Sequence, residues 1–166
     1  MALVKLDTYY PNYKDVLDNI DIKNFDVYGS NDEKVGSVQN ILVDEDTGRF
    51  RYLIIDTGFW VFGKKVLLPI GIASIDESQR RVTIPGLTKQ QVEDLPEFTE
   101  DLAIDRDYEE SVRSIYRPSI STSTTMSSYD RDSYDYQQEP YFYDMSQEGS
   151  ATFRTYEERL ISAKGR

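Results

Sequence analysis

Short runs of apolar residues, some alternating with polar ones, fill the chain between residues 22 and 85. Such runs, bounded by Gly, Pro, Asn and Asp, are typical of β-strands. They predict strands over residues 23–28, 35–43, 49–57, 63–70, 72–75 and 80–84. About six short strands at this spacing predict a mainly β fold, a small closed or partly open barrel.

Turn residues mark the ends of several of these strands. The loop Asp44-Glu45-Asp46-Thr47-Gly48 predicts a hairpin between the second and third strands, with Gly48 suited to a positive φ. Pro69 has no N–H to donate to a sheet ladder, so it predicts the end of the fourth strand.

A helix signal follows the last strand. Thr88 and Gln91 form a capping box, and Leu87 with Val92 supplies the hydrophobic staple that often accompanies one. Pro96 disfavours helical backbone in the residue before it. The pattern therefore predicts a short helix that ends near residue 95 and caps one open end of the barrel.

The remaining segments differ in composition from the β region. Near the N-terminus, Asn12 predicts the cap of a short helix, and near the C-terminus Thr155 and Glu158 form a second capping box. Between the capping helix and that box the chain is acidic, rich in Ser, Thr and Tyr, and poor in aliphatic residues, which predicts disorder. We therefore predict an N-terminal segment, a barrel domain, a disordered acidic linker and a short C-terminal helix, over residues 1–19, 20–96, 97–152 and 153–166.

The composition of the chain disfavours several classes of function. The chain has no cysteine and no histidine, so the usual thiolate, general-base and zinc-binding side chains are missing. The formal net charge is -11, with 17 acidic and 11 basic residues in positions 1–100 and 13 acidic and 8 basic residues from residue 101 onward. Neither part offers a basic surface for phosphates, so nucleic-acid binding is not expected. We expect no enzymatic activity and no catalytic, cofactor-binding or metal-binding residues.

The N-terminus lacks the basic start and long apolar run of a signal peptide. No stretch reaches the roughly 18 to 20 apolar residues that cross a bilayer. These features predict a cytoplasmic protein without direct membrane insertion.

Two short motifs suggest ligand sites but fail in detail. Residues 58–64 fit the phosphate-binding pattern G-x-x-x-x-G-K, but Lys65 replaces the Ser or Thr that holds magnesium, and a strand follows instead of a helix. The loop 44–48 resembles the start of an EF-hand loop, but its glycine comes one position early. Ile55 also stands where the bidentate glutamate is needed. We therefore expect neither a nucleotide nor a calcium site.

A longer pattern spans the hairpin and the strands around it, and consists of Gly36, Asp44, Thr47-Gly48-Arg49, Tyr52, Asp56 and Val66 to Pro69. Together these residues resemble the signature of the PRC-barrel family, over about residues 20 to 85. That family is named for the cytoplasmic domain of the photosynthetic reaction centre H subunit. The resemblance implies a small β-barrel and a structural role for Gly36, Asp44, Gly48, Arg49, Tyr52, Asp56 and Pro69.

The order of segments is similar to that of cyanobacterial PRC-barrel proteins of the akinete-marker and stress-related type. In these, an acidic linker follows the barrel, and the next region begins with a Glu-Glu-Arg-Leu-like segment that Tyr156 to Ile161 resembles. The resemblance leads us to expect a non-enzymatic adaptor that binds other proteins, forms a homodimer and takes part in stress or photosynthetic physiology.

An alternative is a role like that of the H subunit in photosynthetic light reactions and electron transfer. Surface carboxylates would then relay protons, and the chain would associate peripherally with a photosynthetic membrane complex. Ribosome or RNA association, found elsewhere in the family, is disfavoured by the acidic charge of this chain.

One aromatic segment is a candidate interaction site. Phe59-Trp60-Val61-Phe62 contains the only tryptophan and precedes Lys64 and Lys65. Alternate residues of a barrel segment point inward, so half of these aromatic side chains should be exposed. One interpretation is that Phe59, Trp60, Phe62, Lys64 and Lys65 contact a partner or a second copy. The alternative is that the aromatic side chains of residues 59–62 pack in the core of the barrel.

Overall fold

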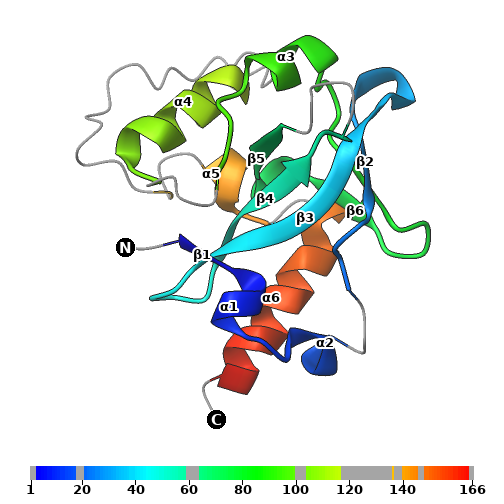
Figure 1. Cartoon of the computed structure of the whole chain (residues 1–166). Helices are drawn as coiled ribbons and strands as arrows, with labels where there is room; N and C mark the ends of the chain where they lie inside the picture. The colour runs from blue at the N-terminus through cyan, green and yellow to red at the C-terminus, as the bar shows by residue number, and fades with distance from the viewer. Residues whose placement is uncertain are drawn as a thin grey trace.

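The computed structural model describes residues 3–17, 21–58, 64–99, 104–116, 136, 140–145 and 148–164. Its strands form one seven-stranded sheet, with short helices packed around it (Figure 1). The strands are β1 (Leu3–Lys5), β2 (Asp26–Tyr28), β3 (Lys34–Asp44), β4 (Phe50–Asp56), β5 (Lys65–Pro69), β6 (Ser74–Asp76) and β7 (Arg81–Thr83).

The long strand β3 organises the sheet. It pairs antiparallel with β4 along one edge, and its other edge is shared by β2 near its start and β1 near its end. The order β5-β4-β3-β2-β7-β6 contains one parallel pair, β2 with β7. The six strands expected from the sequence are present, which confirms the mainly β fold.

The sheet is not closed. Among the described strands, β5 and β6 stand at opposite ends of the order and are not paired with each other, so the partly open form of the predicted barrel is the correct one. The seventh strand, β1, was not expected from the sequence. Its three residues are too few to show alternation, and it forms only by pairing with Leu42 to Asp44, about forty positions away.

The predicted capping helix is confirmed as α3 (Lys89–Asp94). The hydroxyl of Thr88 accepts from the Gln91 amide at 3.1 Å, and the Thr88 amide donates to the Gln91 side chain at 2.9 Å. Leu87 and Val92, the expected staple, are both buried. The helix lies at one end of the sheet beside α4 (Figure 1).

Two short helices precede the sheet core, α1 (Leu6–Tyr9) and α2 (Tyr13–Val16). The second begins after Asn12, as predicted, although the Asn12 side chain makes no capping hydrogen bond. Tyr13 and Leu17 are buried, and the Tyr13 hydroxyl donates to Asp21 at 2.8 Å.

The structure differs from the predicted disorder over the described parts of residues 97–152. This stretch contains α4 (Arg106–Tyr116) and the short α5 (Pro140–Tyr143). Val112 and Tyr116, four positions apart on α4, are buried, and so are Tyr136, Phe142, Tyr143 and Met145. Composition predicts disorder because aliphatic residues are scarce, whereas most of the buried hydrophobic residues in the described parts of this stretch are tyrosine or phenylalanine.

The C-terminal helix is present as α6 (Ala151–Lys164), and it begins two residues before the predicted segment 153–166. Thr155 does not cap it but lies inside it, where its hydroxyl donates to the Ala151 carbonyl at 3.1 Å. The helix packs near α1 and α2, at the end of the sheet opposite α3 and α4 (Figure 1). Within the described residues, no helix is long and apolar enough to span a membrane.

Candidate functional site

Gly36 and Asp56 hold β3 and β4 close together. A Cβ atom at Gly36 would lie 2.3 Å from the Asp56 carbonyl oxygen, so only glycine permits this approach. The Asp56 carboxylate accepts from the Gly58 amide at 2.9 Å and closes the turn after β4. Pro69 ends β5 opposite Tyr52. These three motif residues shape the backbone of the sheet.

The hairpin between β3 and β4 is fixed by Asp44 and Gly48. The buried Asp44 carboxylate accepts a hydrogen bond from the Asp46 amide at 3.0 Å. The backbone carbonyl of Asp44 accepts one from the Gly48 amide at 2.7 Å. Gly48 has a φ of +78°, the positive value expected from the sequence. A Cβ atom there would meet Tyr9 Oη at 2.7 Å and Ile161 Cγ1 at 2.8 Å. The loop tip is therefore covered by α1 and α6.

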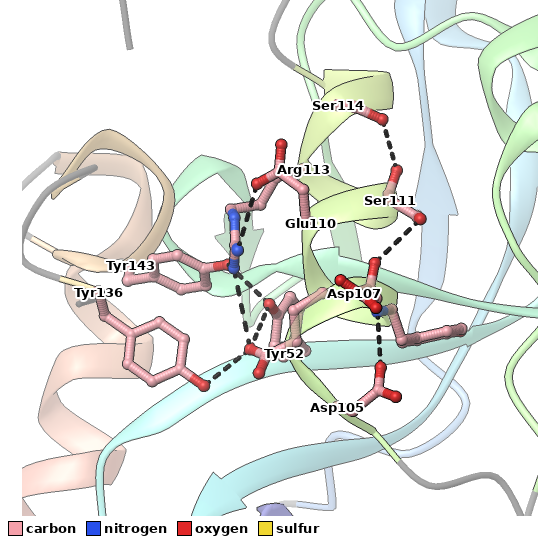
Figure 2. A network of polar contacts seen from close by, with 11 residues as sticks. Tyr52, Asp105, Asp107, Glu110, Ser111, Arg113, Ser114, Tyr136 and Tyr143 are labelled. Carbon is pink, nitrogen blue, oxygen red and sulfur yellow. Dashed lines mark hydrogen bonds and ion pairs between the residues drawn. The ribbon is translucent and has the colours of Figure 1, made fainter. Parts of the chain in front are cut away.

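Tyr52 connects β4 to the later part of the chain. Its fully buried hydroxyl donates to Glu109 Oε1 on α4 at 2.8 Å, and lies 2.6 Å from the Tyr143 hydroxyl on α5. Tyr136 donates to the same Glu109 oxygen at 2.7 Å. We call these residues, with Arg113, the tyrosine cluster, and Figure 2 shows Tyr52, Tyr136 and Tyr143 converging beside α4.

The hydrogen bonds of the tyrosine cluster run in one direction. Arg113 Nη1 donates to the Tyr143 hydroxyl at 3.0 Å. Because the Tyr52 proton is directed to Glu109, Tyr143 must be the donor to Tyr52. Arg113, the first donor of this series, and Glu109, its last acceptor, stand one helical turn apart on α4 and form an ion pair at 3.9 Å. The buried charges are therefore balanced.

Burial raises the pKa of Tyr52 well above its usual range, and the neighbouring Tyr143 and Glu109 add to the effect. Burial likewise raises the pKa of Tyr136 and Tyr143. All three phenols therefore stay protonated at neutral pH, as the direction of the hydrogen bonds requires. The cluster serves to attach α4 and α5 to β4.

A second attachment joins the hairpin to α6. The Phe50 amide donates to Glu157 Oε2 at 2.7 Å, and Arg49 Nε lies 3.1 Å from Glu157 Oε1. Glu157 is almost fully buried, and this burial raises its pKa despite the opposing effects of the Phe50 amide and Arg49. Arg51 lies nearby, 3.7 Å from the Asp44 carboxylate and over the ring of Tyr136. We call residues 44–51 with Glu157 the hairpin site.

A family model for the PRC-barrel domain matches residues 15–91 of the chain. Residues 15–91 are a PRC-barrel domain. An uncharacterized protein of Deinococcus radiodurans is 43% identical to the chain over 76 residues. That alignment covers 46% of this chain and 27% of the relative, so the chain spans only about a quarter of the relative's length.

The motif residues of the PRC-barrel domain thus fall into two groups. Gly36, Asp56 and Pro69 shape the sheet. The hairpin residues and Tyr52 also receive polar groups from segments beyond the matched domain. Within the described residues, no group of three or more Asp or Glu side chains is arranged to hold a metal ion.

The predicted aromatic interaction segment is only partly within the described residues. Phe59, Trp60 and Phe62 lie outside them, so their contact with a partner stays a prediction. Lys64 Nζ donates to the Glu93 carbonyl at 2.7 Å and so satisfies the C-terminal end of α3. Lys65 begins β5, and its carbonyl accepts from the Phe98 amide at 2.8 Å.

Sequence reasoning did not identify five residues of these two sites, namely Glu109, Arg113, Tyr136, Tyr143 and Glu157. A helical signal for α4 was available. Asp105 is placed to cap the helix, and its carboxylate accepts from the Tyr108 amide at 2.9 Å. Tyr108, Val112 and Tyr116 then recur every four residues on one face. For Glu157, the resemblance of its segment to a second conserved region was the available signal.

Proposed function

We propose that this chain is a non-enzymatic protein-interaction module, in which the PRC-barrel domain binds helical segments on the hairpin site and on β4. One observation carries the proposal: Arg49, Phe50 and Tyr52 hold polar groups of α4 and α6 from 57 to 108 positions away in the sequence. These contacts combine backbone donors, a guanidinium and buried aromatic surface, the usual components of a recognition surface.

The chemistry of both sites supports binding over catalysis. The buried carboxylates Glu109 and Glu157 are each fully engaged by hydrogen bonds and arginines. A general acid or base needs access to a substrate proton. With their partners in the same chain, these groups stabilise contacts between segments.

Affinity capture from cells with the full chain as bait tests the proposed function. Arg49→Glu reverses a half-exposed charge at the hairpin site, and Lys34→Glu reverses a similarly exposed charge at the start of β3. We expect at least one protein whose recovery falls about fivefold or more with Arg49→Glu and stays unchanged with Lys34→Glu. Equal recovery with both variants, or no captured protein, would contradict the proposal.

Several finer expectations from the resemblance stay predictions. They are a stress-related or photosynthetic role, the alternative role in light reactions and electron transfer, a homodimer, and a cytoplasmic location. The same capture experiment bears on the first two through the identity of the proteins recovered.

A further inference from the structure

The buried face of α6 contains a charged residue. Phe153, Tyr156, Glu157 and Leu160 follow the spacing i, i+3, i+4, i+7, and each is at most 4% exposed. Apolar residues fill this pattern in most packed helices, and burying a carboxylate costs free energy unless it is well paired. The glutamate therefore needs a dedicated receptor on the surface that α6 covers.

The hairpin site supplies that receptor. Both oxygens of Glu157 are bound, Oε2 by the Phe50 amide at 2.7 Å and Oε1 by Arg49 Nε at 3.1 Å. The amide donor belongs to the backbone at the start of β4, so its position is set by the hairpin itself. Arg51 adds a second positive charge close by, offset by Asp44. The chain as a whole is acidic, but the Phe50 amide with Arg49 and Arg51 forms a local site that binds a carboxylate.

Glycine at the loop tip lets a helix come close. Any side chain at Gly48 would collide with Ile161 on α6 and with Tyr9 on α1. Lys164, at the end of α6, donates to the Tyr9 carbonyl at 3.0 Å. A gap of glycine size, an amide donor and an arginine together define the shape and charge of the helix that fits.

We propose that the hairpin site is a receptor for helices that carry a glutamate within an apolar face, and that α6 is its built-in occupant. This inference rests on the proposed function and names the partner class. A partner helix with an aromatic residue four positions before the glutamate and leucine three positions after it competes with α6. Tethering gives α6 a high effective concentration, so partners bind weakly until α6 is displaced.

A labelled peptide of residues 148–164 provides the probe, with binding to the full chain followed by fluorescence anisotropy. Glu157→Lys in the full chain sets a lysine against Arg49 and releases α6. Glu158→Lys makes the same change one position along, on an exposed residue, and is the matched control. We expect the peptide to bind the Glu157→Lys chain at least tenfold more tightly than the wild-type or Glu158→Lys chain.

The reciprocal change in the peptide tests recognition of the carboxylate. A Glu157→Lys peptide should bind the released chain at least tenfold more weakly than the native peptide, and a Glu158→Lys peptide should bind equally well. Leu160→Ala in the full chain, which shortens an apolar anchor without adding charge, is a second way to release α6 if the lysine variant is poorly folded.

Equal peptide affinity for the wild-type and released chains would overturn the inference, and so would a Glu157→Lys peptide that binds as well as the native one. A dimer in light scattering that Glu157→Lys dissolves and Glu158→Lys preserves would assign the site to a second copy's α6 instead. If capture from cells still depends on Arg49 while the peptide fails to bind, the proposed function stands and the partner class is wrong.

Discussion

Replacing Tyr52 with phenylalanine tests whether the tyrosine cluster fastens α4 and α5 to the sheet. The change removes one hydroxyl and leaves the aromatic ring, so packing on β4 is preserved. It deletes the hydrogen bond to Glu109 at 2.8 Å and the acceptor for Tyr143 at 2.6 Å. Glu109 keeps its bond from Tyr136.

The expected cost follows from these two contacts. A hydrogen bond to a charged group contributes about 1.5–3 kcal/mol, and a buried hydroxyl without a partner adds about 1 kcal/mol. We therefore expect the free energy of unfolding to fall by about 3 kcal/mol, which for a chain of this size lowers the melting temperature by roughly 6–12 °C.

Urea unfolding followed by far-ultraviolet circular dichroism at pH 7 measures the loss. Tyr28→Phe is the matched control, because the Tyr28 ring stacks on Arg81 but its hydroxyl has no hydrogen bond within the described part of the chain. Its removal should change the free energy of unfolding by less than about 0.5 kcal/mol. Equal losses for the two variants would refute an attachment role for the cluster.

Three further predictions concern backbone fit and titration. Gly36→Ala should lower the free energy of unfolding by about 3 kcal/mol because its Cβ would lie 2.3 Å from the Asp56 carbonyl oxygen. Gly86→Ala, at a φ of +84° in open space, should lower it by about 1 kcal/mol in the same urea assay. A larger loss for Gly86→Ala than for Gly36→Ala would contradict this prediction. Burial raises the pKa of Glu157, so the stability that its protonated form contributes is present below about pH 4.5 and is lost as pH rises through the raised pKa. Glu157→Gln should therefore make the free energy of unfolding less dependent on pH above about pH 4.5. An unchanged pH dependence would show that Glu157 is not its cause. Burial also raises the pKa of a group of tyrosines, namely Tyr13, Tyr52, Tyr108, Tyr116, Tyr136 and Tyr143. Absorbance titration should therefore show these tyrosines ionising only well above pH 10, together with unfolding of the chain. A single transition of all tyrosines near pH 10 would be inconsistent with the structure.

The strands and α3 could be predicted because their signals are local. The hairpin loop and the Thr88 capping box each depend on a few neighbouring residues, and the structure reproduces both. Alternation of apolar residues likewise located β3 and β4 to within two residues at either end. Nothing distant in the sequence is needed to specify these features.

The tyrosine cluster and the hairpin site could not be predicted from the sequence, because their residues contact partners that are far away along the chain. Glu109 and Glu157 look like solvated acids in the sequence, and only Tyr52 and Phe50, 57 and 107 positions away, make their burial possible. Composition predicts a disordered linker because nothing in the sequence shows which core its aromatic residues join. For the described residues Tyr116, Tyr136 and Tyr143, that core is the surface of the PRC-barrel domain, where they contact Leu67, Arg51 and Tyr52.

Amide hydrogen exchange at Phe50 in the full chain tests most directly whether the hairpin site holds a helix carboxylate. The Phe50 amide should exchange slowly in the wild-type chain because Glu157 accepts its proton at 2.7 Å. In Glu157→Ala it should exchange at least about tenfold faster, while the amide of Leu53, inside the ladder between β3 and β5, should change little. Equal Phe50 exchange in the two chains would show that the domain does not hold α6 through this carboxylate.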